Sequence, residues 1–93
     1  MSGPPTGMQD WLVFVVKGLV DHPEVVRVTP VSQRGLTLFE LRVHPDDAGK
    51  VIGRKGATIN ALRALLQVGG AKQGERLTVD LVEDDDDNEA AAD

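Results

Sequence analysis

Two glycines three positions apart, Gly53 and Gly56, constrain the fold of this chain more than any other feature, because helix-forming sequence lies on both sides of them. Residues 46–52 can form a short helix, and residues 57–68 can form a longer one. Glycine adopts positive φ at little cost and has no Cβ to block an approaching backbone. The segment from Gly53 to Gly56 is therefore predicted to be a sharp turn between two helices.

Inside this turn stand Arg54 and Lys55, whose side chains should point outward. The backbone N–H groups at the start of the second helix, and the positive end of its dipole, favour an anion at the same place. Two cations, a helix N-terminus and an accessible backbone together suit a sugar-phosphate chain. The alternative interpretation is a solvated turn with two incidental charges, which is the common situation of surface cations.

The residues around the turn carry a family resemblance. The run Val51-Ile52-Gly53-Arg54-Lys55-Gly56, followed by Ile59, resembles the G-x-x-G signature of KH domains, whose loop clamps single-stranded RNA or DNA. With its flanking helices and Asp21-His22-Pro23 upstream, the segment 8–82 is similar to the small single-KH bacterial RNA-binding proteins of the KhpA family. That resemblance implies an RNA chaperone or post-transcriptional regulator, acting as a homodimer or with a second KH-containing protein.

The net charge of −5 argues against a nucleic-acid partner until its distribution is considered. Residues 83–93 hold seven acidic residues and no basic one, and are predicted to form a disordered acidic tail. Residues 1–82 carry +2, with no acidic residue between Asp47 and Glu75. The basic residues of that interval, which centre on the glycine turn, are Lys50, Arg54, Lys55, Arg63 and Lys72.

The length of 93 residues allows one small domain, predicted at residues 8–82 after a flexible leader at residues 1–7. The absence of cysteine excludes disulfides and thiolate metal sites. No apolar run approaches the roughly 20 residues of a membrane span. The first basic residue is Lys17, which is too late for the charged start of a secretory signal. These features favour a cytoplasmic protein.

Hydrophobic spacing predicts an α+β fold with the order helix-strand-strand-helix-helix-strand. A helix is expected at residues 8–20, and strands at residues 25–31, 36–44 and 76–82. The long helix is expected to end at Gly69-Gly70, with a loop up to residue 75. Two helices separate the last two strands, so these strands should be parallel. The result is a three-stranded mixed sheet with helices on one face, which the resemblance to a type II-like KH domain also implies.

The predicted RNA-binding residues fall into three groups. The cations supply charge, the glycines allow close approach, and the branched residues could line an apolar groove for unstacked bases, as the resemblance to KH domains implies. For the branched residues, core packing is the alternative, and it is at least as good an explanation of Ile59. No aromatic residue adjoins the turn, so recognition by stacking is not expected. The full set is Lys50, Val51, Ile52, Gly53, Arg54, Lys55, Gly56, Ile59 and Arg63.

A second face of the long helix is predicted to bind a partner. It carries Ala61, Ala64, Leu65 and Val68, where a helix that faces only solvent would carry charge. Helix propensity could explain the alanines but not Leu65 or Val68. Pairing through this face would place two glycine turns on one RNA and raise avidity. A protein-interaction module that works mainly through this helix, and a ribosome-assembly factor, are the alternative functions.

Enzymatic activity is not expected. Lys50 is followed by Val51, where a phosphate-binding P-loop would have Ser or Thr. His22 and His44 are isolated in the sequence. The pair Asp46-Asp47 is predicted to favour the start of the short helix rather than to bind a metal. No cofactor and no metal are therefore predicted.

Overall fold

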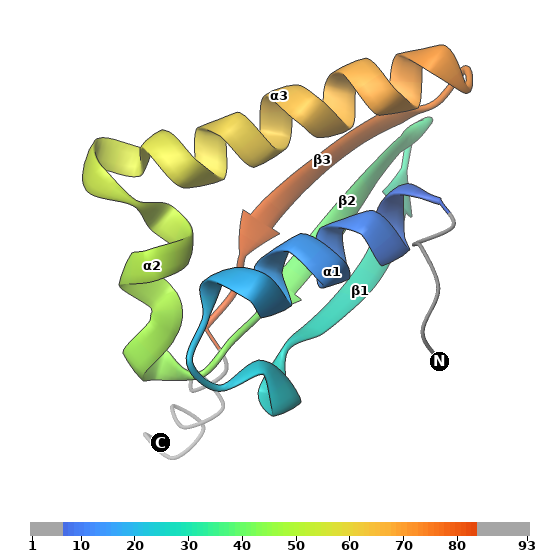
Figure 1. Ribbon diagram of the computed structural model, residues 1–93. Coiled ribbons are helices and arrows are strands. Elements are labelled where there is room, and N and C mark those ends of the chain that lie inside the picture. The colour runs from blue at the N-terminus through green and yellow to red at the C-terminus, as the bar shows by residue number, and fades with distance from the viewer. Residues whose placement is uncertain (1–6, 84–93) are drawn as a thin grey trace, which may run out of the picture.

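The computed structural model describes residues 7–83 (Figure 1). The predicted element order is confirmed, with a short 3₁₀ turn added before β1, before α2 and before α3. Apart from Gly7 and Glu83, the predicted leader and acidic tail lie outside the described residues. The helices and strands are α1 (Met8–Leu19), β1 (Arg27–Gln33), β2 (Leu36–Arg42), α2 (Ala48–Ile52), α3 (Ala57–Lys72) and β3 (Arg76–Leu81).

The three strands form one mixed sheet in the order β1-β2-β3. β1 and β2 are antiparallel and are joined by a tight turn at Arg34 and Gly35, whereas β2 and β3 are parallel. α1 and α3 lie across one face of the sheet (Figure 1). α2 stands beside the N-terminal end of α3. The predicted α+β fold with a three-stranded mixed sheet is therefore confirmed. Within residues 7–83, no helix combines the length and the apolar character needed to cross a lipid bilayer.

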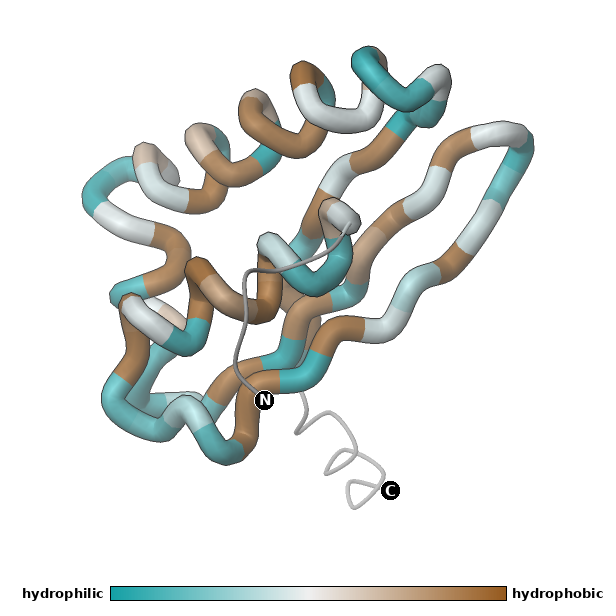
Figure 2. The backbone as a smooth tube through the Cα atoms, turned by 45° about the vertical axis from the view of Figure 1, so that its right-hand side comes forward, coloured by the Kyte–Doolittle hydropathy of each residue, from teal (hydrophilic) through white to brown (hydrophobic). Residues whose placement is uncertain are grey.

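The hydrophobic core lies between the helices and the sheet. α3 contributes Ile59, Leu62 and Leu66, whose spacing places them on one side of the helix, and the alternating residues of β2 and β3 meet them from the sheet. Hydrophobic segments alternate with hydrophilic ones along the strands in Figure 2, and in β2 and β3 the buried residues share the face toward the helices. The buried apolar residues are Leu12, Val16, Phe39, Leu41, Val51, Ile59, Leu62, Leu66, Leu77 and Val79.

Several predicted boundaries differ from the structure. β1 begins two residues late, because Pro23, whose fixed φ suits a helical start, opens a 3₁₀ turn at Pro23–Val25. β2 ends at Arg42 because the ring of His44 accepts the Asp46 N–H and so begins the turn Pro45–Asp47. α2 consequently starts at Ala48, two residues after the predicted start.

The prediction that Gly69-Gly70 ends the long helix is wrong, because α3 continues to Lys72. A Cβ on Gly70 would lie 2.8 Å from the backbone oxygen of Glu75 and 2.9 Å from Leu77 Cγ. Gly70 therefore lets the start of β3 pass close against the helix. The left-handed glycine that the turn after α3 requires is Gly74, with φ of 76°.

This packing predicts opposite effects for two Gly→Ala substitutions in helices. Gly70→Ala should destabilise the fold by about 1–3 kcal/mol, because its methyl group must displace backbone. Gly18 in α1 has no atom within 4 Å of the same position, so Gly18→Ala should stabilise by up to about 1 kcal/mol. Urea denaturation of the two variants measures both values. Equal gains in stability would contradict the close approach at Gly70.

Candidate nucleic-acid interface

The segment from Gly53 to Gly56 forms the sharp connection that the sequence predicts between the two helices. α2 closes with a hydrogen bond from the Gly53 N–H to the Gly49 oxygen, at 2.9 Å. The Gly56 N–H then donates to the Gly53 oxygen at 3.1 Å, and α3 begins at Ala57. The chain thus reverses at one corner of the molecule, where α2 meets α3 (Figure 1).

Gly53 and Gly56 are required to be glycine for different physical reasons. Both have φ of 77°, which side chains disfavour. A Cβ on Gly53 would also lie 2.8 Å from the backbone nitrogen of Thr58, so the start of α3 fills that space. A Cβ on Gly56 would meet only the amide of Asn60, at 3.5 Å. Gly56 is therefore needed mainly for its left-handed conformation, and its surroundings stay open.

Arg54 and Lys55 are both exposed at this corner, as predicted. Lys55 has φ of 55° and ψ of 30°, a left-handed conformation that costs a non-glycine residue about 1–2 kcal/mol. Within residues 7–83, neither cation has a carboxylate within ion-pairing distance. The corner appears as a hydrophilic segment in Figure 2. Two positive charges without an ion-pair partner in the described part of the chain thus project from a strained turn, and such strain commonly marks a functional site.

A buried carboxylate, that of Asp47, positions α2 and hence the turn. It accepts the backbone N–H groups of Asp21 and His22 at 3.1 and 3.0 Å, and the His22 ring at 3.1 Å. Burial alone would raise the pKa of this carboxyl, but these hydrogen bonds outweigh it and lower the pKa from 3.8 to about 2. Asp46 and Asp47 directly precede α2, as predicted, but Asp47 makes no side-chain cap there because its carboxylate holds the α1–β1 connection instead.

Lys50 is less available than its position beside the turn suggested. Its Nζ lies 3.2 Å from Asp21 Oδ2 and 3.6 Å from Asp47 Oδ1. The Asp21 carboxylate, with a smaller contribution from Asp47, raises the pKa of Lys50 above its usual value. Lys50 therefore stays charged, while two carboxylates already balance its charge.

Arg63 is likewise engaged within the protein. Its Nε donates to the Val79 oxygen at 2.9 Å, and its two terminal nitrogens donate to Asn60 Oδ1 at 2.8 Å and Asp80 Oδ1 at 2.6 Å. This network joins α3 to the open edge of β3. Neither Asn60 nor Asp80 was predicted from the sequence as a site residue. The spacing of Asn60 three residues before Arg63 was a usable signal, whereas Asp80 comes close only through the fold.

The three branched residues proposed to line a base groove occupy different environments. Val51 is fully buried and Ile59 nearly so, and both belong to the hydrophobic core. Ile52 is 39% exposed and directly precedes Gly53. Of the three, Ile52 alone offers substantial apolar surface next to the turn.

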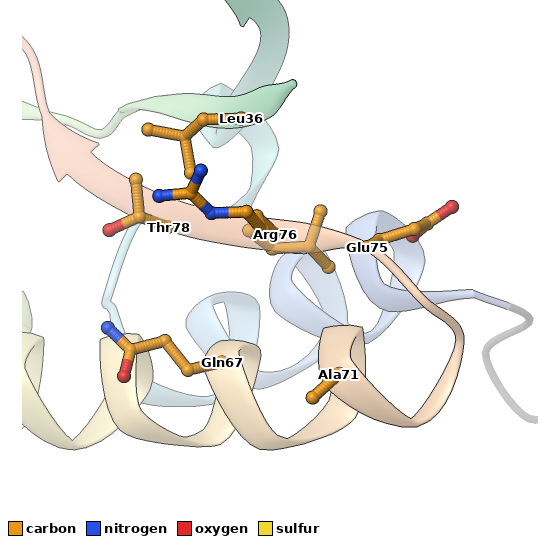
Figure 3. Close-up of a pocket in the computed structure, with 7 residues that line it drawn as sticks. Leu36, Gln67, Ala71, Glu75, Arg76 and Thr78 are labelled. Carbon is orange, nitrogen blue, oxygen red and sulfur yellow. The ribbon is translucent and has the colours of Figure 1, made fainter. Parts of the chain in front are cut away.

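A shallow groove follows the open edge of β3, and Figure 3 shows side chains of α3 on one side of it and of the sheet on the other. Arg63, Gln67 and Ala71 are spaced by four residues and so form one row along α3. This row leads from the groove toward the Gly53–Gly56 turn. None of the residues that line the groove was predicted to be a site residue. They are Leu36, Gln67, Ala71, Glu75, Arg76, Leu77 and Thr78.

The residues predicted to bind a partner lie on another side of α3. Ala61, Ala64, Leu65 and Val68 are all exposed, with Leu65 at 52% and Val68 at 67%. The neighbouring Gly69 faces Met8, so this side of the helix borders α1. The groove and this apolar face therefore occupy different sides of one helix.

Comparison with known proteins agrees with this architecture. A family model described as "KhpA/KhpB, KH domain" matches residues 9–81. A protein from Leifsonia xyli subsp. xyli, named RNA-binding protein KhpA, is 49% identical over 78% of this chain and 93% of its own length. Proteins with the same name from Streptomyces coelicolor and Mycobacterium leprae are 46% and 49% identical, over 84% and 86% of this chain and 95% and 96% of their own lengths. No solved structure gives a significant match.

The geometry of the turn predicts that its glycines tolerate substitution differently. Gly53→Ala should destabilise the fold by several kcal/mol, because positive φ and the backbone of Thr58 both oppose a Cβ. Gly56→Asn should cost about 1 kcal/mol or less, since asparagine accepts the left-handed conformation. Thermal unfolding followed by circular dichroism measures the two effects. Equal losses of stability would show that the positive φ alone, and not the contact with Thr58, accounts for the cost of replacing Gly53.

Proposed function

The chain belongs to the KhpA/KhpB family of KH domains, and from this premise we propose that it binds single-stranded RNA through the turn Gly53–Gly56. The observation that carries the proposal is the pair Arg54 and Lys55, exposed and without an ion-pair partner among the described residues. Relatives that cover most of the chain are named RNA-binding proteins. The proposal is one of binding without catalysis.

In the proposed complex, Arg54 and Lys55 bind backbone phosphates beside the N-terminus of α3. Gly56 has open surroundings, so the nucleic-acid backbone can come close to it. Ile52 provides apolar surface next to the phosphates, while Val51 and Ile59 hold the turn from the core. Binding of this kind depends on charge and on shape more than on base identity.

Lys50 and Arg63 have a supporting role in this proposal. Arg63 keeps α3 against the edge of β3 through Val79 and Asp80, which maintains the groove beyond the turn. Lys50 holds α2 to the Asp21 and Asp47 carboxylates. A strand leaving the turn along α3 would pass Arg63 and then Gln67 in this groove.

The proposed cellular role is that of an RNA chaperone or post-transcriptional regulator in the cytoplasm. Phosphate binding without a stacking platform suits a protein that holds many RNAs loosely. A ribosome-assembly factor uses the same chemistry on ribosomal RNA and is the neighbouring alternative.

The test is charge reversal at Arg54 and Lys55. Arg54→Asp with Lys55→Asp should abolish most binding of a mixed-sequence single-stranded RNA on filters. Removal of two phosphate contacts should also reduce the slope of log affinity against log salt by about 1.4. The control is Arg27→Asp with Arg34→Asp, an equal charge change on exposed residues of β1 and its turn. Equal losses in both double variants, with folding intact, would reject the turn as the binding site.

A second proposed activity is pairing through the apolar face of α3, because Leu65 and Val68 leave apolar surface exposed on a helix that also carries the turn. The partner would be a second copy of the chain or another KH-containing protein. The family description names two members, KhpA and KhpB, which supports a mixed pair as well as a homodimer.

Substitution of Leu65 tests this face. Leu65→Glu should convert a dimer into a monomer in sedimentation velocity, since a buried carboxylate without a partner is costly at an interface. Gln67→Glu is the control, because Gln67 lies on the groove side of the same helix. A Leu65→Glu chain that keeps the mass of the parent dimer would exclude the apolar face of α3 as the dimer interface.

A further inference from the structure

The two histidines of the chain are far apart in sequence but adjacent in the fold. His22 follows α1 and His44 follows β2, at the place where these two connections pass each other (Figure 1). Their rings stack with centroids 3.9 Å apart and 15° between the planes. One ring nitrogen of each, and one carboxylate oxygen of Asp46, lie within 4.8 Å of one another. We infer that His22, His44 and Asp46 bind a divalent transition-metal ion such as Zn²⁺.

His22 has the hydrogen-bond partner that usually supports a metal-binding histidine. Its Nδ1 lies 3.1 Å from Oδ2 of the buried Asp47, and a carboxylate can only accept a hydrogen bond. Nδ1 therefore carries the proton, and in the neutral ring Nε2 keeps a free lone pair. A carboxylate that receives the second ring N–H is the usual support of a histidine that binds metal, because it fixes both tautomer and orientation.

His44 and Asp46 supply the other two ligands. The backbone N–H of Asp46 donates to His44 Nδ1 at 3.0 Å, so this nitrogen is unprotonated in the neutral ring, and its single lone pair must leave that hydrogen bond to bind an ion. The same nitrogen lies 3.7 Å from Asp46 Oδ2. Two ligand atoms at about 2.1 Å from a tetrahedral ion are about 3.4 Å apart, so the pair is already near the spacing of a chelate. The Asp46 side chain is well exposed and can close this difference.

The surrounding charges favour a cation. The carboxylates of Asp21, Asp46 and Asp47 gather here, and the ammonium of Lys50 faces two of them. Two imidazoles and one carboxylate form a ligand set suited to zinc, nickel or copper rather than to magnesium or calcium, which prefer oxygen. Water would complete the coordination.

Binding requires a small movement of the rings. Stacked rings hold their nitrogen lone pairs nearly parallel, so the rings must turn for these to converge on one ion. The His22 and His44 side chains are 35% and 34% exposed, which leaves room for that rotation. The ion would then join the α1–β1 connection to the start of α2, in addition to the link that Asp47 makes. Its role is structural, and it does not depend on RNA binding.

The test is Zn²⁺ titration of the full chain without an affinity tag, by calorimetry and by thermal unfolding. We expect one ion per chain and a rise in Tm of about 10 °C when free Zn²⁺ is about 100-fold above its Kd. A chelator should reverse the rise. His44→Gln and Asp46→Asn should each weaken Zn²⁺ binding by at least about tenfold. Neither side chain is a partner of the buried Asp47 carboxylate, so both variants should fold, as circular dichroism can verify.

Glu75→Gln is the matched control, because it removes an exposed carboxylate away from the histidines and should leave the affinity unchanged. The acidic residues 83–93 are present in every variant, so an ion held by them would bind all variants equally. Absence of Zn²⁺ binding to the parent chain would overturn the inference. Retention of full affinity by either His44→Gln or Asp46→Asn would also overturn it, since each supplies one of the three ligands.

Discussion

The reversal of the backbone between α2 and α3 depends on φ angles that few residues accept. Gly53 and Gly56 both have φ of 77°, and Lys55 between them has φ of 55°. These angles allow α3 to turn back over the sheet, so that its apolar row reaches the core beneath it. They also place Arg54 and Lys55 at the outside of the bend. The fold and the proposed RNA contact thus rest on the same four residues, and the strain at Lys55 must be offset by the core.

Asp47 connects the part of the chain that carries the turn to the N-terminal part. Its buried carboxylate binds two backbone N–H groups and one ring of the α1–β1 connection, and Lys50 of α2 lies beside it. α1 is therefore attached to the element that carries the turn, in addition to its packing on the sheet.

Local patterns were sufficient to predict most of the fold, because apolar periodicity identifies helices and strands wherever one face is buried. They failed to predict the end of α3 at Gly69-Gly70, because glycine occurs both at helix ends and where two backbones pack closely. Only the close approach of Glu75 to Gly70 in the fold distinguishes these two roles. In the site, exposure of Arg54 and Lys55 followed from the turn itself. The pairing of Lys50 with Asp21 and of Arg63 with Asp80 could not be predicted, since these partners are remote in sequence.

Near the turn, Lys50 and Arg63 are engaged within the protein, whereas Arg54 and Lys55 have no ion-pair partner among residues 7–83, which limits the proposed RNA contact to two phosphates. Two phosphate contacts on a single strand give a salt slope of only about 1.4, which corresponds to weak binding. Tight binding then requires more than one turn on the same RNA. α3 carries the turn at its start and the exposed Leu65 and Val68 farther along. Pairing through that face would fix the separation of two turns, and the gain in effective concentration would supply affinity that neither turn has alone.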